Sequence, residues 1–164
     1  STVHTGALTA SGLVPSTLYY ARIRYGSDNH LSEYSDTVSF TTQDATIIAP
    51  TVTSPTDLAT DIGKTIGITT SAYSVLGHIE THLSTTIQVA SDAGFTTIVS
   101  ETVDDVVNLV SWTSGDLAVS TTYYVRAKYK SATYDSGFGA SVSFTTSTSF
   151  GSTYGLKLDT LYAV

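Results

Sequence analysis

Hydrophobic and polar residues alternate strictly along residues 13–25, so the segment has two faces of different character. The more apolar face carries Leu13, Pro15, Thr17, Tyr19, Ala21, Ile23 and Tyr25. The wetter face carries Val14, Ser16, Leu18, Tyr20, Arg22 and Arg24. A period of two with one wetter face predicts a half-buried strand of an antiparallel sheet. Residues 26–30 have turn composition, and residues 34–42 are predicted to return as the second strand of a hairpin.

This predicted hairpin occurs twice in the chain. Residues 112–146 align without a gap with residues 8–42, at an offset of 104 residues. The match keeps its register through both strands and through the turn between them. It therefore indicates an internal repeat about the size of one small domain.

Between the two copies, short apolar segments alternate with turn signals. Ile66, Ile68, Ile87 and Val89 are expected to face inwards. We expect loops at residues 56–63 and 73–84. The predicted strands cover residues 50–55, 65–72, 85–91, 95–103 and 106–112. Together with the second hairpin, about seven short strands in about 100 residues predict a sandwich of two antiparallel sheets.

The chain is therefore expected to be all-β, with domains in tandem. Residues 1–45 are predicted to be the C-terminal half of a first domain, with a linker at residues 43–50. Residues 46–147 are predicted to form a complete domain, and residues 148–164 a linker plus a C-terminal strand or the start of a further element. Two strands alone make no stable sheet. The rest of the first domain must come from residues upstream of Ser1, from another chain or from the C-terminal tail.

The composition fits this fold class and limits the chemistry. The chain has 23 Ser, 30 Thr and 11 Tyr, and side chains such as Thr and Tyr pack well on pleated sheets. It has no Cys, which excludes disulfides and thiolate chemistry. The net charge of −7 without a basic stripe argues against nucleic acid as a partner. No apolar run reaches the length of a membrane span, so we expect none.

The repeated hairpin resembles the last strands of a fibronectin type III domain. Leu13, Pro15, Thr17 and Tyr19 form a Leu-x-Pro-x-Thr-x-Tyr pattern, and a Val-x-Phe-x-Thr strand follows. The second copy keeps Leu117, Thr121 and Tyr123, with Val119 in place of the proline. The resemblance implies tandem fibronectin-III-like (Ig-like) antiparallel sandwiches. It also implies that Tyr19 and Tyr123 form tyrosine corners, in which the hydroxyl bonds to nearby backbone.

A second resemblance concerns the setting of the protein. Residues 50–63, with Pro-x-Val-x-Ser-Pro-x-Asp-x-Ala-Thr-Asp-Ile-Gly, and residues 81–95 are similar to Ig-like or fibronectin-like repeats in bacteriophage tail and fibre proteins. The resemblance implies a non-enzymatic structural role in the virion, as a tail, fibre or surface-decoration module. Its partners would be other virion proteins, copies of itself or a host surface glycan. The alternative is a carbohydrate-binding or spacer module of a secreted or cell-surface bacterial enzyme or adhesin.

Candidate chemistry along the chain is sparse. On an extended segment, His78, Glu80 and His82 would point the same way and form a partial ligand set for Zn²⁺. A polar loop explains these residues better, because no fourth ligand is visible. No Gly-x-Ser-x-Gly elbow or glycine-rich phosphate loop occurs. We therefore expect no catalytic residues, no cofactor and no enzymatic activity.

The outward-facing side chains of the two hairpins are the candidate interface. They combine Tyr with basic residues, and exposed Tyr and Arg are favoured at recognition surfaces. The alternative is a purely structural role, in which these side chains pack across neighbouring strands and cover the outer face of a sheet. The candidate residues are Tyr20, Arg22 and Arg24 in the first copy and Tyr124, Arg126 and Lys128 in the second.

Overall fold

The computed structural model describes residues 9–149, and their regular secondary structure consists of β-strands. No helix of the described part is long and apolar enough to cross a membrane. The strands are β1 (Leu18–Ala21), β2 (Val38–Thr41), β3 (Thr46–Ile47), β4 (Val52–Ser54), β5 (Ala59–Ile62), β6 (Gly67–Thr70), β7 (Val75–Leu76), β8 (Ser84–Ala90), β9 (Ile98–Asp105), β10 (Ser111–Thr113), β11 (Thr122–Lys130) and β12 (Val142–Thr146). The prediction of an all-β, largely antiparallel chain is therefore confirmed.

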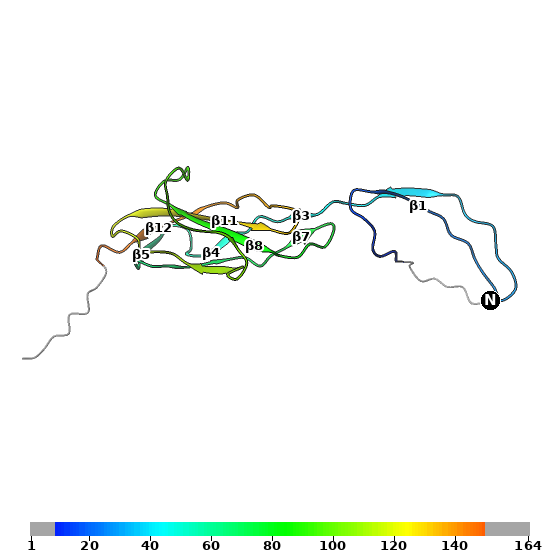
Figure 1. The fold of residues 1–164 in the computed structure, drawn as a ribbon, viewed down its shortest axis with the longest axis horizontal. Helices are drawn as coiled ribbons and strands as arrows, with labels where there is room; N and C mark the ends of the chain where they lie inside the picture. Colours follow the sequence, from blue (N-terminus) through cyan, green and yellow to red (C-terminus); the bar gives the residue numbers. More distant parts are fainter. Residues whose placement is uncertain (1–8, 150–164) are drawn as a thin grey trace, which may run out of the picture.

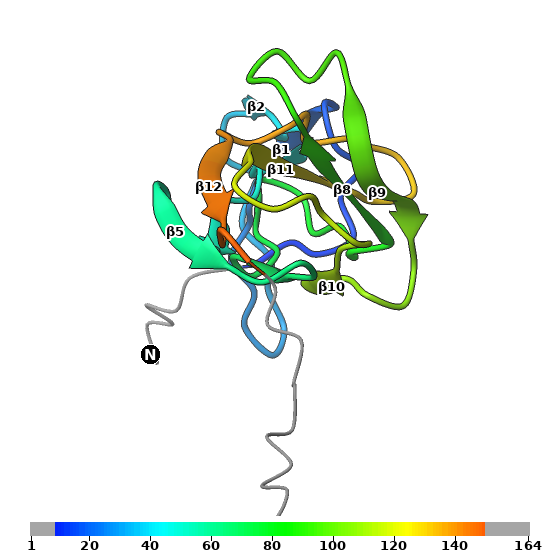
Figure 2. The same ribbon diagram turned by 90° about the vertical axis from the view of Figure 1, so that its left-hand side faces the viewer.

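The larger sheet is built around the second hairpin. Its order is β5-β12-β11-β8-β9, and β11 pairs antiparallel with both β12 and β8. Along β11 every second residue is buried, as the alternation of its sequence predicts. Figure 2, viewed along the length of the molecule, shows β12, β11, β8 and β9 side by side with β5 at the outer edge.

A three-stranded sheet with the order β10-β6-β4 lies across the core from the larger sheet. Ile66 and Ile68 from this side meet Ile87, Val125 and other side chains of the larger sheet in one hydrophobic cluster. Ile68, Ile87 and Val125 are all completely buried, so these two sheets enclose one shared core. The predicted inward direction of Ile66, Ile68, Ile87 and Val89 is confirmed.

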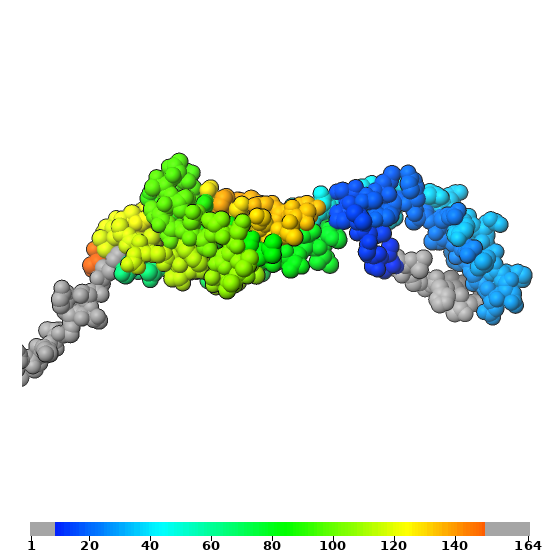
Figure 3. All heavy atoms as spheres, in the orientation of Figure 1, coloured from blue at the N-terminus to red at the C-terminus, as the bar shows by residue number. Residues whose placement is uncertain are grey.

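The first hairpin, β1 and β2, extends from one end of this two-sheet unit (Figure 1). Its register repeats that of β11 and β12 at the offset of 104 residues: Tyr19 faces Phe40, and Tyr123 faces Phe144. The described residues 9–42 contain no buried residue, and their only sheet is this two-stranded one. The space-filling view shows this hairpin as a thin arm beside the thicker two-sheet unit (Figure 3).

The junction between the arm and the two-sheet unit differs from the prediction. Residues 43–50 were expected to be a linker and residues 73–84 a loop, but β3 lies in the first segment and β7 in the second. The two strands pair antiparallel, Thr46 with Leu76 and Ile47 with Val75. The linker packs onto the unit that follows it because this contact buries the apolar side chains of Ala45 and Ile47.

The predicted loop at residues 56–63 is also wrong, because it contains β5, which pairs parallel with β12. The open edge of β12 captures this segment through its backbone. Leu58 N donates to Ser143 O at 2.8 Å, and Ser143 N donates to the Asp57 carboxylate at 2.8 Å. The predicted strand at residues 106–112 is reduced to β10, since residues 106–110 form a bend. Of the segment predicted at residues 148–164, a linker plus a C-terminal strand or the start of a further element, residues 150–164 lie outside the described residues.

Candidate interaction surfaces

The outer face of β11 is organised around Arg126. Its guanidinium carbon lies 4.0 Å from the ring centroid of Phe95 and 3.9 Å from that of Phe138. Nε and Nη2 both donate to Gln88 Oε1, at 3.0 and 2.9 Å. Gln88 in turn donates to Glu101 at 3.0 Å. Arg126 is thus held between two aromatic rings and a planar acceptor, which suits its rigid, flat head group.

Lys128 continues the same stripe but is also engaged within the chain. Its Nζ lies 2.6 Å from Asp135 Oδ2 and 5.5 Å from the ring centroid of Phe138. Desolvation acts to raise the pKa of Asp135, but the bonds to Lys128 and to the backbone N–H of Gly137, together with the charges of Lys128 and Lys130, outweigh it, so this pKa is lowered. Arg126 and Lys128 of the second hairpin are therefore both engaged in intramolecular contacts.

The equivalent outward-facing residues of the first hairpin, Tyr20, Arg22 and Arg24, also place arginine beside an aromatic ring but make fewer contacts. Arg22 lies 3.9 Å and Arg24 4.9 Å from the ring centroid of Tyr34, the residue that matches Phe138 in the repeat. Tyr20 is 70% exposed. Of the six candidate interface residues, those on the first hairpin are the ones whose side chains are open to solvent.

Both tyrosines assigned to tyrosine corners bond to backbone five residues upstream. The hydroxyl of Tyr19 accepts a hydrogen bond from Val14 N at 2.9 Å, and that of Tyr123 accepts one from Ala118 N at 3.1 Å. This is the geometry that the resemblance implies for these positions. Each hydroxyl ties the start of a hairpin to the strand that follows.

His78, Glu80 and His82 form no metal site, because no group of three potential ligands comes together within residues 9–149. The His82 ring instead stacks on Tyr73, with centroids 4.6 Å apart, and lies 4.5 Å from the Tyr129 ring. Its Nε2 is 2.9 Å from Thr85 Oγ1, whose own proton goes to Leu109 O. This ring nitrogen is therefore engaged in a hydrogen bond within the chain.

Burial sets the ionisation of this aromatic cluster. Desolvation lowers the pKa of His82 and raises the pKa of Tyr73, to which the Glu80 carboxylate adds a smaller effect in the same direction. Both shifts favour the neutral side chains. The hydroxyl of Tyr73 is buried and has no hydrogen-bond partner in the described structure.

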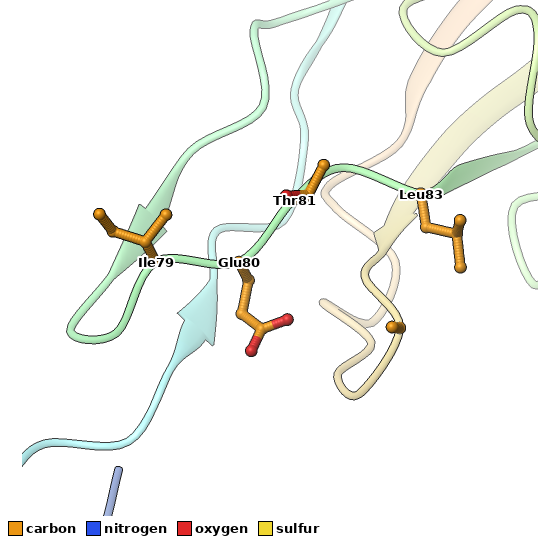
Figure 4. A pocket seen from close by; sticks show the side chains of 5 residues that line it. Ile79, Glu80, Thr81 and Leu83 are labelled. Carbon is orange, nitrogen blue, oxygen red and sulfur yellow. The ribbon is translucent and has the colours of Figure 1, made fainter. Parts of the chain in front are cut away.

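A shallow pocket lies beside this cluster and is lined by Ile79, Glu80, Thr81, Leu83 and Ala132. In Figure 4 the four labelled side chains come from one continuous segment between β7 and β8, and they do not converge on a common point. The Ile79 side chain is 85% exposed. The pocket therefore offers no arrangement of groups that would perform chemistry.

The junction between the hairpin and the two-sheet unit forms a second hollow, lined by residues from both parts, Leu13 and Pro15 on one side and Gly77 and His78 on the other. The hydroxyl of Tyr134 donates to Asp44 across this junction. That bond, followed by one from the Ala45 N–H, lowers the pKa of Asp44. The contacts attach the linker to the unit that follows it.

The apolar face of the first hairpin, which would be its inner face in a two-sheet unit, is uncovered. We call Tyr19, Ala21, Ile23, Tyr25 and Phe40 the open face. Tyr25 is 74% exposed, Ile23 49% and Phe40 41%. Their equivalents in the second hairpin, Tyr129, Ala127 and Phe144, are 0%, 0% and 1% exposed. The same hairpin is thus buried in one copy and bare in the other.

Gln88, Phe95 and Phe138, which immobilise Arg126, are not expected from the sequence as its partners. The repeat contains a signal for one of them, because Phe138 aligns with Tyr34 and both aromatic rings lie beside an arginine. Gln88 and Phe95 belong to β8 and to the turn after it, outside the repeated segment. No sequence pattern links them to Arg126.

Comparisons with known proteins do not assign the chain to a family. No protein-family model and no curated protein matches it. Among solved structures, the chain is similar to the crystal structure of Streptomyces avermitilis alpha-L-rhamnosidase complexed with L-rhamnose, with 17% identity and a TM-score of 0.40. The match covers 63% of this chain and 11% of that one. A similarity at this level supports no argument about fold or function.

Proposed function

We propose that the chain is a non-enzymatic structural protein of a bacteriophage virion, built from tandem fibronectin-III-like sandwiches. In this role it acts as a spacer in a tail, fibre or surface decoration and contacts neighbouring proteins or the host surface through its strands. The resemblance of residues 50–63 and 81–95 to phage repeats motivates the setting. The two sheets around one core and the duplicated hairpin support the fold.

The observation that carries the spacer role is the docked junction between the two parts. A spacer transmits position only if successive modules are held in a defined relation to one another. Here β3 pairs with β7, Ala45 and Ile47 are buried, and Tyr134 bonds to Asp44. A flexible tether would instead be rich in glycine and serine and would make no such contacts.

The test is to locate the protein in material produced from the genome that encodes it. Phage particles are induced, purified on a density gradient and analysed by mass spectrometry, and an antibody against residues 46–147 is used for immunogold electron microscopy. We expect the chain to co-purify with intact particles and the gold to mark an appendage or the capsid surface. Major capsid protein serves as the positive control for recovery.

Recovery from the culture supernatant or cell surface without particles would overturn the virion setting. It would favour the alternative, a carbohydrate-binding or spacer module of a secreted enzyme or adhesin. A glycan array probed with the chain then separates the two forms of that alternative. Binding that is lost in Tyr20→Ala would indicate a carbohydrate module, since exposed aromatic rings stack on sugars, whereas absence of binding would indicate a spacer.

A further inference from the structure

The two hairpins share the same local hydrogen bonds but differ in what packs around them. The N–H of Thr17 donates to Thr42 Oγ1 at 3.0 Å, and that of Thr121 donates to Thr146 Oγ1 at 3.0 Å. The N–H of Tyr25 donates to Ser32 Oγ at 2.8 Å, and that of its equivalent, Tyr129, donates to Ser136 Oγ at 2.9 Å. The first hairpin therefore keeps local hydrogen bonds of the second, and it lacks the facing sheet and the flanking strands that the second hairpin has in β5 and β8.

The open face keeps the shape and the polarity of a face that packs against a second sheet. At two neighbouring positions the sizes are exchanged, Val125 and Ala127 in one copy against Ala21 and Ile23 in the other, so that the total volume is nearly retained. The hydroxyl of Tyr129 bonds to Thr70 Oγ1 and Ser71 O on the opposite side of the core. Tyr25 carries the same hydroxyl at the same position, although nothing in the described structure covers it.

We propose that the open face is the inner face of another two-sheet unit and binds a β-segment of the same kind as residues 46–115. This segment, the layer, supplies a facing sheet like β10-β6-β4 and strands beside the hairpin like β5, β8 and β9. This layer is supplied by polypeptide that lies N-terminal to the hairpin in the same chain. One of its strands pairs with the free edge of β1 as β8 pairs with β11. The covalent order is that of the second unit, in which residues 46–115 lead directly into the hairpin. This inference does not depend on the virion setting.

Other copies of these 164 residues cannot supply the layer to every first hairpin. The described residues contain two hairpins but one layer of this kind, and that layer is already covered by the second hairpin. Any number of copies therefore leaves half of the hairpins uncovered. Residues 1–8 and 150–164 are each far shorter than residues 46–115 and cannot supply the layer. Two open faces packed together would bury two Tyr25 hydroxyls without the carbonyl that Tyr129 finds at Ser71.

The test compares the 164-residue chain with an extended chain in which a copy of residues 46–115 replaces residues 1–11. This join keeps the register of the repeat, because Gly12 aligns with Asp116. Hydrogen exchange is followed by mass spectrometry in peptides covering residues 18–25. We expect the amides that point away from β2 to exchange at least about 100-fold more slowly in the extended chain. Residues 122–129 should be equally protected in both.

Two substitutions with matched positions control the comparison. Ile23→Asp places a charge on the open face, so it should remove the added protection in the extended chain and change little in the 164-residue chain. Tyr20→Asp places the same charge on the outer face and should leave the added protection intact. The added copy carries Phe at the position of Trp112, so that the fluorescence of the native Trp112, which packs against the core of the native two-sheet unit, checks that this unit is folded in every variant.

Three results would overturn the proposal. The first is equal exchange of residues 18–25 in the two chains, which means that such a layer does not cover the face. The second is full protection of these residues in the monomeric 164-residue chain. The third is protection that rises with concentration together with a dimeric mass in sedimentation, which means that a second copy covers the face.

Discussion

At the scale of single residues, Arg126 links the outer face of the larger sheet to the two loops beside it. Lysine cannot reproduce this arrangement, because its point charge cannot stack flat between Phe95 and Phe138 while donating twice to Gln88. We expect Arg126→Lys to lower the free energy of unfolding of the two-sheet unit by about 1–2 kcal/mol. Urea denaturation followed by Trp112 fluorescence measures this loss.

The matched control is Arg22→Lys in the first hairpin. Arg22 stacks on one ring, that of Tyr34, at an exposed site, so its contribution is smaller. We expect Arg22→Lys to change the free energy of unfolding in the same urea experiment by less than about 0.5 kcal/mol. If the two substitutions had equal effects, the double stacking of Arg126 would contribute nothing to stability.

Asp105 provides a prediction for acid conditions. The N–H of Asn108, followed by its side-chain amide and the N–H of Val107, lowers the pKa of Asp105 from 3.8 to about 2. A lowered pKa in the folded state means that the stabilisation is complete above the unfolded value near pH 4. It is then lost as the pH falls through about 2. The carboxylate thus holds the turn after β9 at neutral pH.

We expect Asp105→Asn to flatten the dependence of the urea midpoint on pH between about 4 and 2. Asn108→Ala removes one donor and leaves the two backbone N–H groups in place. It should raise the pKa of Asp105 only part of the way towards 3.8 in an NMR titration of the carboxyl carbon. An unchanged pKa in Asn108→Ala would show that the side-chain amide does not bind Asp105.

At the scale of elements, equal hairpins in unequal surroundings separate local hydrogen bonding from packing. Tyr129→Phe removes the hydroxyl that bonds to Thr70 and Ser71 at the core; Ser71 O loses this donor, while Thr70 Oγ1 keeps its bond to Val110 O. We expect it to cost about 1–3 kcal/mol in the urea unfolding of the two-sheet unit. Tyr25→Phe changes a hydroxyl on a side chain that is 74% exposed. In the 164-residue chain it should therefore be neutral in the same measurement and in the exchange of residues 18–25.

The sequence predicts these elements wherever local patterning decides the structure. Strict alternation along residues 13–25 and the repeat at residues 117–129 are enough to assign both hairpins, and the inward direction of Ile68 and Ile87 follows from the same rule. The alternation does not predict a strand whose only partner is a sheet edge that forms in the folded structure. Residues 59–62 become strand β5 because they pair with the otherwise free edge of β12. Residues 56–63 show no alternation of apolar and polar residues from which this pairing could be predicted.

The candidate site shows the same limit. Alternation correctly places Tyr124, Arg126 and Lys128 on one face of β11, with their neighbours buried. It cannot show that Phe95 and Phe138 close over Arg126, because these rings come from turns that meet only after β8 and β11 pair. The predicted direction of His78, Glu80 and His82 assumes an extended segment. Stacking of His82 on Tyr73 and Tyr129 replaces that arrangement with packing against the core.

At the scale of the whole molecule, the geometry of the arm depends on one close approach at the junction. Gly77 has φ +80°, and a Cβ at this position would lie 2.1 Å from Asp44 O. The backbone of the linker therefore passes where any side chain would stand. This contact adjoins the pairing of β3 with β7, so the linker can dock only if residue 77 is glycine.

We expect Gly77→Ala to release β3 from β7 and to let the first hairpin reorient independently. Gly137→Ala is the matched control: its φ is +69° and a Cβ there meets nothing within 4 Å, so it carries the same backbone cost of about 1 kcal/mol without the clash. Amide ¹⁵N relaxation gives a separate rotational correlation time for each part. Gly77→Ala should shorten that of residues 18–41 relative to residues 84–146, and Gly137→Ala should leave their ratio unchanged. Equal ratios in both variants would mean that the junction does not set the direction of the arm, and the spacer role would lose its structural basis.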